Sequence, residues 1–347
     1  MRQGAEQPRK ILVTGGAGFI GSHYVRTLLS GGYPGAAGAS VTVLDKLTYA
    51  GNLANLEPVA GSPRYTFVHG DICDPRLVAS VLPGHDVVVN FAAETHVDRS
   101  ITGAAGFVEA NVAGVQVLLQ GCLDAGVRRL VQVSTDEVYG SIDDGAWAED
   151  APLAPNSPYA AAKAGGDLLA RAYARTHGLD VVITRCCNNY GPYQYPEKVI
   201  PLFVTNLIDG LPVPLYGDGR NVRGWVHVDD HCRGIQLALQ RGEPGQVYHI
   251  NGNAELANTE LTQALLEACG AGWDRVAWVP DRKGHDRRYC LDDSRLRALG
   301  YRPRIPFADG LRATIRWYQD NPGWWRPLKG RGPVPAGTGG QAGPGPA

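Results

Sequence analysis

Short apolar segments alternate with helical patterns through the first half of the chain. Each apolar segment has the length of one buried strand, and the segments lie at 11–13, 41–45, 65–71, 86–90 and 130–134. Residues 24–29 and 75–82 between them show the spacing of helices. Continuous apolar strands separated by helices are typical of a parallel sheet that helices cover on both faces. We therefore predict an α/β fold with a Rossmann-like, doubly wound parallel sheet.

The pattern changes after about residue 185. Pro, Asn, Tyr and Gly become frequent in 188–196 and 212–219, and shorter helical patterns return from residue 257 and at 307–320. The last residues are nearly all Gly, Pro and Ala, which cannot bury enough apolar surface to offset chain entropy. We predict a first domain, a smaller irregular α/β lobe from which some segments can return to the first domain, and a disordered tail, over 9–185, 186–329 and 330–347.

The composition narrows the classes of function. The 347 residues suffice for one large or two modest domains, and the formal net charge is -1. No segment is strongly basic, so nucleic acid is not an expected partner. Apolar windows such as 87–93 are far too short to cross a bilayer and the N-terminus does not resemble a signal peptide, so no membrane partner is expected. The seven cysteines lack metal-ligand spacing, which indicates buried reduced thiols in a cytoplasmic protein without a metal site.

A glycine loop follows the first predicted strand and opens a helix. Gly15, Gly18 and Gly21 recur at a three-residue pitch, which lets the backbone turn sharply and approach a pyrophosphate at the helix N-terminus. Asp45 ends the second strand, where a carboxylate accepts hydrogen bonds from ribose hydroxyls and repels a 2'-phosphate. This context favours NAD over NADP. The alternative is a plain strand–turn–helix corner in which Asp45 caps a loop.

A second carboxylate follows the third predicted strand. Asp71 ends the run Gly70-Asp71-Ile72 and is placed to receive the amino group of an adenine. It is equally placed to cap the next helix, and the sequence leaves both interpretations open.

A tyrosine and a lysine lie one turn apart at the start of a predicted helix. Tyr159 and Lys163 are at positions i and i+4 behind Pro158, so they share one helix face. A free tyrosine has a pKa of about 10, and a nearby ammonium favours its phenolate, so the pair can serve as a base near neutral pH. The same lysine can hold a nicotinamide ribose. The alternative is a chance pair on a surface helix.

Two adjacent acids end the strand at 130–134. Neighbouring side chains of a strand point to opposite faces, so Asp136 and Glu137 could not share a pocket if the strand continued. We therefore expect the chain to leave strand geometry at about Thr135 or Asp136 and to aim both carboxyl groups at one substrate. The alternative is that the two acids merely cap the following helix.

Together these motifs resemble the extended short-chain dehydrogenase/reductase family, whose members mostly act on nucleotide sugars. The segment STDEVYG at 134–140 narrows the resemblance to TDP-glucose 4,6-dehydratases, with the deoxysugar-pathway enzymes of actinomycetes the most similar in character. The resemblance extends over roughly residues 9 to 328. It includes further segments at 45–52, 94–100, 188–193, 196–198 and 281–286.

The resemblance implies an internal redox cycle with tightly bound, recycled NAD. Tyr159 would take the proton of the sugar 4-hydroxyl while hydride leaves carbon 4, and Thr135 would hydrogen-bond the 4-oxygen. Glu137 would then remove the proton from carbon 5, and Asp136 would protonate the departing 6-hydroxyl before hydride returns to carbon 6. One carboxyl must be charged and the other protonated, as a desolvated like-charge pair allows.

The resemblance also assigns contacts. For the cofactor they are Gly15, Gly18, Phe19, Ile20, Gly21, Asp45, Lys46, Leu47, Thr48, Asp71, Ile72, Phe91, Ala92, Ala93, Tyr159, Lys163 and Asn189. For the nucleotide sugar they are Thr95, Thr135, Asn188, Lys198, Val199, Pro214, Tyr216, Arg223, Asn258, Asp281 and His285. The forked guanidinium of Arg223 suits a diphosphate, and Tyr216 and His285 match positions near the thymidine.

Three positions depart from the usual family pattern. Thr95 replaces a common serine, Ala110 replaces a threonine that often contacts the cofactor, and Gly224 follows Arg223 where an acid is usual. We expect the change at Gly224 to loosen the positioning of Arg223.

Competing functions remain within and outside this enzyme class. A nucleotide-sugar 4-epimerase or UDP-glucuronate decarboxylase needs the tyrosine, the lysine and NAD but no acid to expel a 6-hydroxyl, so the pair Asp136 and Glu137 argues against both. A non-catalytic dinucleotide-sensing protein on the same fold can lose the tyrosine or the lysine, whereas this chain keeps both. The family usually forms homodimers through two helices per subunit, for which the helix that starts at Pro158 and the segment 108–124 are the candidates.

Overall fold

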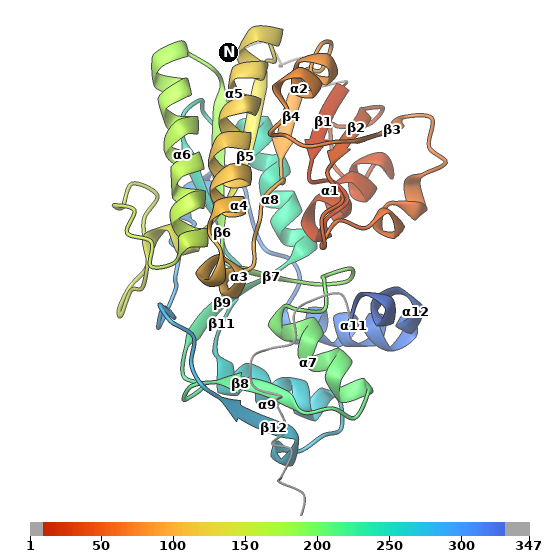
Figure 1. The fold of residues 1–347 in the computed structure, drawn as a ribbon, viewed down its shortest axis with the longest axis vertical. Coiled ribbons are helices and arrows are strands. Elements are labelled where there is room, and N and C mark those ends of the chain that lie inside the picture. Colours follow the sequence, from red (N-terminus) through yellow and green to blue (C-terminus); the bar gives the residue numbers. More distant parts are fainter. Residues whose placement is uncertain (1–9, 330–347) are drawn as a thin grey trace, which may run out of the picture.

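The computed structural model describes residues 10–329, so the predicted tail at 330–347 lies outside the described residues. A parallel sheet of seven strands forms the upper part of the molecule in Figure 1, in the order β10-β6-β5-β4-β1-β2-β3. The predicted Rossmann-like α/β class is therefore confirmed. The strands are β1 (Lys10–Thr14), β2 (Ser40–Asp45), β3 (Tyr65–His69), β4 (Val87–Asn90), β5 (Arg129–Thr135), β6 (Val181–Cys186) and β10 (Val247–Ile250).

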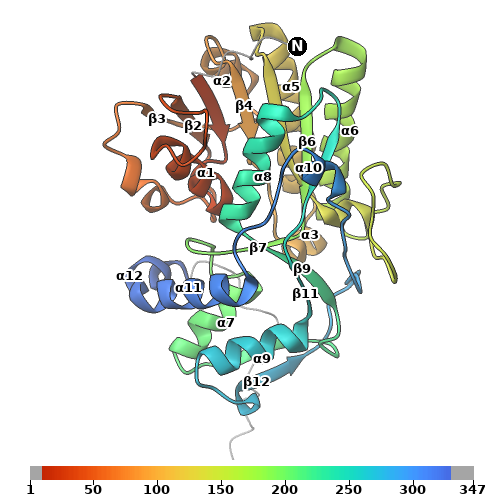
Figure 2. The same cartoon turned by 180° about the vertical axis from the view of Figure 1, so that it is seen from behind.

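Helices cover both faces of this sheet. One face carries α1 (Phe19–Leu29) and α8 (Val228–Arg241), seen from behind in Figure 2. The other face carries α2 (Pro75–Val81), α5 (Gly114–Ala125) and α6 (Pro158–His177). Successive side chains of β1 show why the strand is apolar throughout, because Ile11 and Val13 lie in the first core and Leu12 lies in the second.

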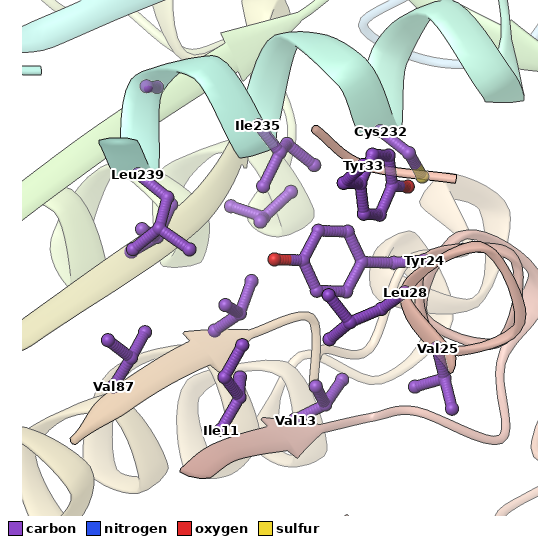
Figure 3. Packing of buried hydrophobic residues seen from close by; sticks show 14 of the residues in the cluster. Ile11, Val13, Tyr24, Val25, Leu28, Tyr33, Val87, Cys232, Ile235 and Leu239 are labelled. Carbon is purple, nitrogen blue, oxygen red and sulfur yellow. The ribbon is translucent and has the colours of Figure 1, made fainter. Parts of the chain in front are cut away.

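Tyr24 occupies the middle of the core between α1, α8 and the sheet. Figure 3 shows its ring between Ile235 and the side chains of β1. The ring lies 5.3 Å from that of Tyr33, centroid to centroid, and its buried hydroxyl donates to Gln236 Oε1 at 2.6 Å. The polar tip of this aromatic side chain is therefore satisfied inside an apolar layer.

A second lobe lies below the sheet in Figure 1. Its core joins α7, α9 and α11 with strands that lie outside the main sheet. The strands are β7 (Asn188–Tyr190), β8 (Val213–Tyr216), β9 (Val222–His227), β11 (Ala254–Ala257) and β12 (Val276–Val279). The helices are α7 (Val199–Ile208), α9 (Asn258–Ala268), α11 (Phe307–Asp320) and α12 (Pro322–Trp325).

Residues after 185 do not all lie in this lobe. Strand β10 joins the edge of the main sheet beside β6, and α8 and α10 (Ser294–Ala298) pack against the same region. The division into domains at residues 185 and 186 stays a prediction.

The remaining elements are short. Two helical turns, α3 (Val97–Thr102) and α4 (Ala105–Val108), follow β4, and a π-helical turn η3 (Glu109–Ala113) joins α4 to α5. The 3-10 turns are η1 (Leu53–Asn55), η2 (Glu57–Val59), η4 (Asp136–Tyr139), η5 (Trp273–Arg275) and η6 (Arg326–Leu328).

The helical segment from α4 to α5 is a longer apolar segment than the short windows found in the sequence. Within residues 10–329, Ala105–Ala125 is long and apolar enough to cross a membrane by length and composition alone. It packs along α6 and α2 as part of the helical layer, and 39% of its most apolar window is buried in the protein. Inspection of the apolar windows missed this run because polar residues interrupt it.

The π-helical turn and α6 approach each other closely at a glycine. A Cβ atom on Gly166 would lie 2.4 Å from the carbonyl oxygen of Asn111, a distance that side chains do not tolerate without backbone movement. The helix that carries Tyr159 and Lys163 can therefore pack this closely against the turn only because residue 166 has no side chain.

We expect Gly166→Ala to lower the free energy of unfolding by about 1–3 kcal/mol, because the new methyl group must push the two helices apart. Urea denaturation followed by circular dichroism measures the change. Gly323→Ala in α12 is the matched control, since its Cβ would meet open space, and it should change stability by less than about 1 kcal/mol. Equal stability of the two variants would contradict the close approach.

Candidate active site

The predicted site residues gather at the carboxyl edge of the main sheet, facing the second lobe. In open α/β sheets this edge is where ligands bind. The cofactor set lies after β1, β2, β3 and β4, on α6 and on β7. The substrate set lies after β4, at the end of β5 and on β7, then on elements of the second lobe from α7 to the segment after β12. Figure 1 shows the two parts facing each other across this region.

The glycine loop has the shape that a pyrophosphate requires. Gly15 has a φ of 67°, and a Cβ there would lie 2.5 Å from the backbone nitrogen of Ala92. A Cβ on Gly21 would lie 2.4 Å from the Gly15 carbonyl oxygen. Helix α1 begins at Phe19 behind Gly18, which offers no side-chain cap, so its first N–H groups stay available to an anion. The residues present therefore fit NAD at this position.

Asp45 is buried at the end of β2. Its Oδ2 accepts from the Ala17 N–H at 2.9 Å, and its Oδ1 accepts from the Leu47 N–H at 2.8 Å. Burial raises the pKa of Asp45, and these two N–H groups oppose the rise. The carboxylate thus ties the glycine loop to the segment that contains Lys46, Leu47 and Thr48. Each oxygen retains a second lone pair, so the predicted ribose contact is compatible with this loop-capping role.

The structure excludes one of the two roles offered for Asp71, and the adenine contact stays a prediction. The cap of α2 is Asp74, whose side chain accepts from the Arg76 and Leu77 N–H groups, so the helix-cap interpretation of Asp71 is wrong. Strand β3 also ends earlier than predicted, at His69. The Asp71 carboxylate lies 2.6 Å from Lys46 Nζ. Burial alone would raise the pKa of Asp71, but this ammonium and the Cys73 N–H hold it below its ordinary value.

The acid pair leaves strand geometry where the alternation of side chains predicts. Strand β5 ends at Thr135, and the 3-10 turn η4 begins at Asp136. The Thr135 hydroxyl accepts from the Glu137 N–H at 3.3 Å and donates to Asp136 Oδ1 at 3.2 Å. Thr135 is therefore the cap of this turn, and the alternative that the two acids merely cap a helix is wrong.

The two carboxyl groups have different surroundings. Asp136 is 2% exposed, and burial followed by the charge of Glu137 raises its pKa to about 8. Its Oδ2 is buried without a protein hydrogen-bond partner among the described residues. Burial also raises the pKa of Glu137, but three cations oppose that rise, in order of effect Lys198, Arg223 and Arg282. Asp136 is thus held protonated at neutral pH while the cations favour a charged Glu137.

Tyr159 and Lys163 are buried, so the alternative of a chance surface pair is wrong. The expected stabilisation of the phenolate by the ammonium is not found in the protein alone. Burial, then the charge of Glu137, raises the pKa of Tyr159 well above its ordinary value. Lys163 Nζ donates to the Val133 carbonyl oxygen at 2.7 Å, and burial lowers the pKa of Lys163. A base at Tyr159 therefore needs the positive charge of an oxidised nicotinamide beside it.

Arg223 is held firmly, which corrects the expectation that Gly224 loosens it. Its Nη1 donates to the Val222 carbonyl oxygen at 2.8 Å, and its Nη2 donates to that of Asp286 at 2.8 Å. The guanidinium also lies 4.3 Å from the ring centroid of Tyr289. A Cβ on Gly224 would already lie 3.1 Å from Cys187 Cβ and Asn251 Oδ1, so the position favours a glycine.

Other predicted contacts of the nucleotide sugar meet around the second lobe. Lys198 Nζ donates to the Thr95 carbonyl oxygen at 2.9 Å and so joins the lobe to the loop after β4. His285 Nδ1 lies 2.6 Å from Asp281 Oδ1, and the His285 and Tyr216 rings meet edge to face. The remaining members occupy the starts of α7 and α9, strand β8 and strand β7, at Val199, Asn258, Pro214 and Asn188.

The last cofactor positions follow the same edge. Asn189 donates to Cys186 Sγ and to the Cys187 carbonyl oxygen, which leaves its buried Oδ1 as an unused acceptor. The ring of Phe91 packs against Tyr24. Ile72, Ala92, Ala93 and Ile20 line the strand ends and the start of α1.

Two contributors were not singled out as site residues from the sequence. Arg282 faces Glu137, and its guanidinium lies 4.9 Å from the Tyr216 ring centroid. Asn111, in the π-helical turn, exchanges hydrogen bonds in both directions with the backbone of Glu94 at 3.0 and 2.9 Å. The position of Arg282 inside the segment 281–286, which matches the family, could have identified it as a site residue from the sequence. Asn111 gave none, because its partner lies far away along the chain.

Known proteins resemble the chain over almost its whole length. Residues 12–314 match the profile of the family described as GDP-mannose 4,6 dehydratase. A dTDP-glucose 4,6-dehydratase of Streptomyces niveus is 63% identical over 92% of this chain and 96% of its own. One of an Actinoplanes strain is 61% identical over 91% of this chain and 99% of its own.

A solved structure agrees with these sequences. The crystal structure of DesIV, a dTDP-glucose 4,6-dehydratase from Streptomyces venezuelae with NAD bound, matches with a TM-score of 0.91 and 66% identity. The match covers 92% of this chain and 99% of that chain. The chain therefore belongs to the GDP-mannose 4,6 dehydratase family, within which its resemblance to dTDP-glucose 4,6-dehydratases is confirmed.

Proposed function

We propose that the protein is a TDP-glucose 4,6-dehydratase, which converts TDP-glucose into TDP-4-keto-6-deoxyglucose and water and keeps NAD tightly bound. The observation that carries this proposal is the burial of Asp136 directly beside Glu137 in one turn, which raises the pKa of Asp136 to about 8. An epimerase or a decarboxylase does not expel a 6-hydroxyl and needs no such acid. The sequence identity of 63% and 61% with dTDP-glucose 4,6-dehydratases of Streptomyces and Actinoplanes supports TDP-glucose as the substrate and NAD as the cofactor.

The first step is oxidation at carbon 4. Tyr159 takes the proton of the 4-hydroxyl, and Thr135 donates to or accepts from the same oxygen. Lys163, which is fixed to the Val133 carbonyl oxygen, places a positive charge on the nicotinamide side of Tyr159. Bound NAD supplies the two-electron chemistry by accepting hydride from carbon 4 and returning it to carbon 6.

The second step is elimination of water across carbons 5 and 6. The new ketone acidifies the hydrogen on carbon 5, and Glu137 takes this proton as the carbon–carbon double bond forms. The bond from carbon 6 to oxygen breaks, and Asp136 gives its proton to the departing hydroxyl. When hydride reaches carbon 6, carbon 5 takes back the proton held by Glu137. After the cycle Tyr159 carries one proton more and Asp136 one fewer, so a proton must pass from Tyr159 to solvent and another from solvent to Asp136 before the next turnover.

The second lobe binds the nucleotide in this proposal. Arg223 keeps N–H groups free beyond its three bonds to backbone carbonyl oxygens, and these suit diphosphate oxygens. Tyr216 and His285 offer two aromatic rings for the base. Lys198, at the start of α7, is near enough to Glu137 and Arg282 for their charges to act on its pKa, which burial lowers.

The assembly is proposed as a cytoplasmic homodimer with two-fold symmetry. Apolar side chains are exposed along α3, α4 and α6, at Ile101, Val108 and Leu168. A second copy would cover this face with the same helices, as an isologous interface requires. The seven free cysteines suit a reducing compartment, although Cys73, Cys269 and Cys290 are only partly buried rather than buried as expected.

Incubation with TDP-glucose and no added reductant should yield a 4-keto-6-deoxy product. Substrate that carries deuterium on carbon 4 should give product labelled on carbon 6, because the hydride returns within the same site. Mass spectrometry locates the label. Epimerised sugar, or turnover of UDP-glucuronate in place of TDP-glucose, would contradict the proposed function.

Asp136→Asn should still permit reduction of bound NAD but should slow water loss by about 10²–10⁴-fold, since the amide cannot give a proton to the leaving hydroxyl. Rapid-mixing absorbance of the reduced nicotinamide and quenched product analysis separate the two steps. Asp143→Asn, at an exposed carboxyl of the loop after η4, is the matched control and should behave like the wild type. Unchanged elimination in Asp136→Asn would refute the acid role.

The rate should fall as the pH rises through about 8, because the cycle needs the protonated form of Asp136 and its pKa is raised to that value. The pH profile of kcat/KM for TDP-glucose reports this group in the free enzyme. A rate that stays constant from pH 6 to well above about 8 would show that no such acid is needed.

A further inference from the structure

A chain of buried polar side chains runs behind the catalytic turn. Tyr139 closes η4, two residues after Glu137, and its side chain is 1% exposed. Its hydroxyl accepts from Arg185 Nη1 at 2.5 Å and lies 2.7 Å from His249 Nε2. Arg185 and His249 are themselves fully buried, in β6 and β10. The turn that carries the two acids is therefore tied to two strands of the main sheet.

The direction of each hydrogen bond in this chain follows from its donors. His249 Nδ1 lies 2.8 Å from the Asp292 carbonyl oxygen, which can only accept, so Nδ1 carries the hydrogen. Burial lowers the pKa of His249 to about 3, so the ring is neutral and Nε2 is an acceptor. The Glu149 carbonyl oxygen lies 3.3 Å from the Tyr139 hydroxyl, farther than His249 Nε2 at 2.7 Å. The single hydrogen of the hydroxyl therefore points mainly to His249, and the hydroxyl oxygen is free to accept from Arg185.

The other end of the chain reaches the helix that carries the proposed base. Arg185 Nε donates to Asp167 Oδ2 at 2.9 Å, and both side chains are completely buried. Asp167 lies on α6, one turn beyond Lys163 and two turns beyond Tyr159. A continuous path of hydrogen bonds thus connects the turn with the acids to the helix with the tyrosine and lysine.

This arrangement is not one that stability alone favours. Burial of an ion pair costs desolvation free energy that well-packed apolar side chains avoid. Arg185 Nη2 and Asp167 Oδ1 are, in addition, buried without hydrogen-bond partners among the described residues. Such pairs are useful where they fix one geometry.

We infer that Tyr139 is a positioning residue for the acid pair. The path Asp167–Arg185–Tyr139–His249 fixes the η4 turn against α6 and β10, so that Asp136 and Glu137 face the same sugar as Tyr159. This inference rests on the proposed function, because it concerns the elimination step of that reaction. It assigns a role to the tyrosine of the STDEVYG segment, whose buried hydroxyl contacts Arg185 and His249.

The hydroxyl of Tyr139 can be tested apart from its ring. The ring stacks on Trp147 with a centroid distance of 5.9 Å, and Trp147 Nε1 donates to the Gly140 carbonyl oxygen at 3.2 Å. Tyr139→Phe keeps this packing and removes the joint between Arg185 and His249, together with the longer contact of the hydroxyl with the Glu149 carbonyl oxygen. The turn would then keep its fold but lose its fixed orientation.

Tyr139→Phe should lower kcat about tenfold and leave KM for TDP-glucose within about twofold, because a displacement of the acids well below 1 Å suffices for such a loss. The fraction of bound nicotinamide that is reduced during turnover should rise, since oxidation at carbon 4 depends on α6 and only elimination depends on the turn. Near-ultraviolet absorbance at steady state measures this fraction.

Tyr318→Phe is the matched control. Its hydroxyl is also buried and donates to the Gln194 carbonyl oxygen at 2.5 Å, far from the turn along α11. It should lower the melting temperature in the same way as Tyr139→Phe, with no change in the reduced fraction. Equal reduced fractions in the two variants would overturn the inference and leave Tyr139 as a structural residue only.

His249→Gln provides an independent variant if Tyr139→Phe does not fold. It alters the same path one step further from the turn and should raise the reduced fraction in the same direction. A folded His249→Gln enzyme with a wild-type reduced fraction would overturn the inference. Product formation by the wild type, measured in parallel, separates this failure from that of the proposed function, since a wild type without product would overturn both.

Discussion

The proposed chemistry depends on the burial of two adjacent carboxyl groups away from solvent. Burial is the largest influence on both Asp136 and Glu137, and it acts against their charged forms. Three cations from the second lobe and its border then oppose this effect at Glu137. The charges of this lobe therefore act unequally on the two carboxyl groups of one short turn, with three cations at Glu137 and Arg223 alone at Asp136.

The same burial explains why the site needs its cofactor to complete it. The protein alone holds Tyr159 protonated, and Lys163 gives its hydrogen bond to a backbone carbonyl oxygen. A cationic nicotinamide beside the Tyr159 ring would favour its phenolate, so the proposed base would depend on bound NAD. A site of this kind does not deprotonate sugars indiscriminately, since its base is activated by the partner that receives the hydride.

Local patterns predicted much of this structure, because local physics determines them. Three features follow from backbone geometry, and each was found: the glycine spacing of the first loop, the end of β5 at Thr135 and the start of α6 at Pro158. The lowered pKa expected for Tyr159 is not found in the protein alone, because burial by residues from elsewhere in the chain raises it. The bonds of Asn111 and of Tyr139 were equally hidden, since their partners come from distant segments. Family resemblance could locate the acids but could not show how they are held.

The position of β10 has a consequence for how the chain becomes a folded protein. This strand covers β6, yet the whole of α7, β8, β9 and α8 separates the two along the chain. Until it docks, β6 presents an open row of unpaired backbone groups, which invites pairing with another chain. During synthesis this edge of the sheet therefore stays incomplete until the chain has been made as far as β10, well after the other strands of the sheet have been synthesised.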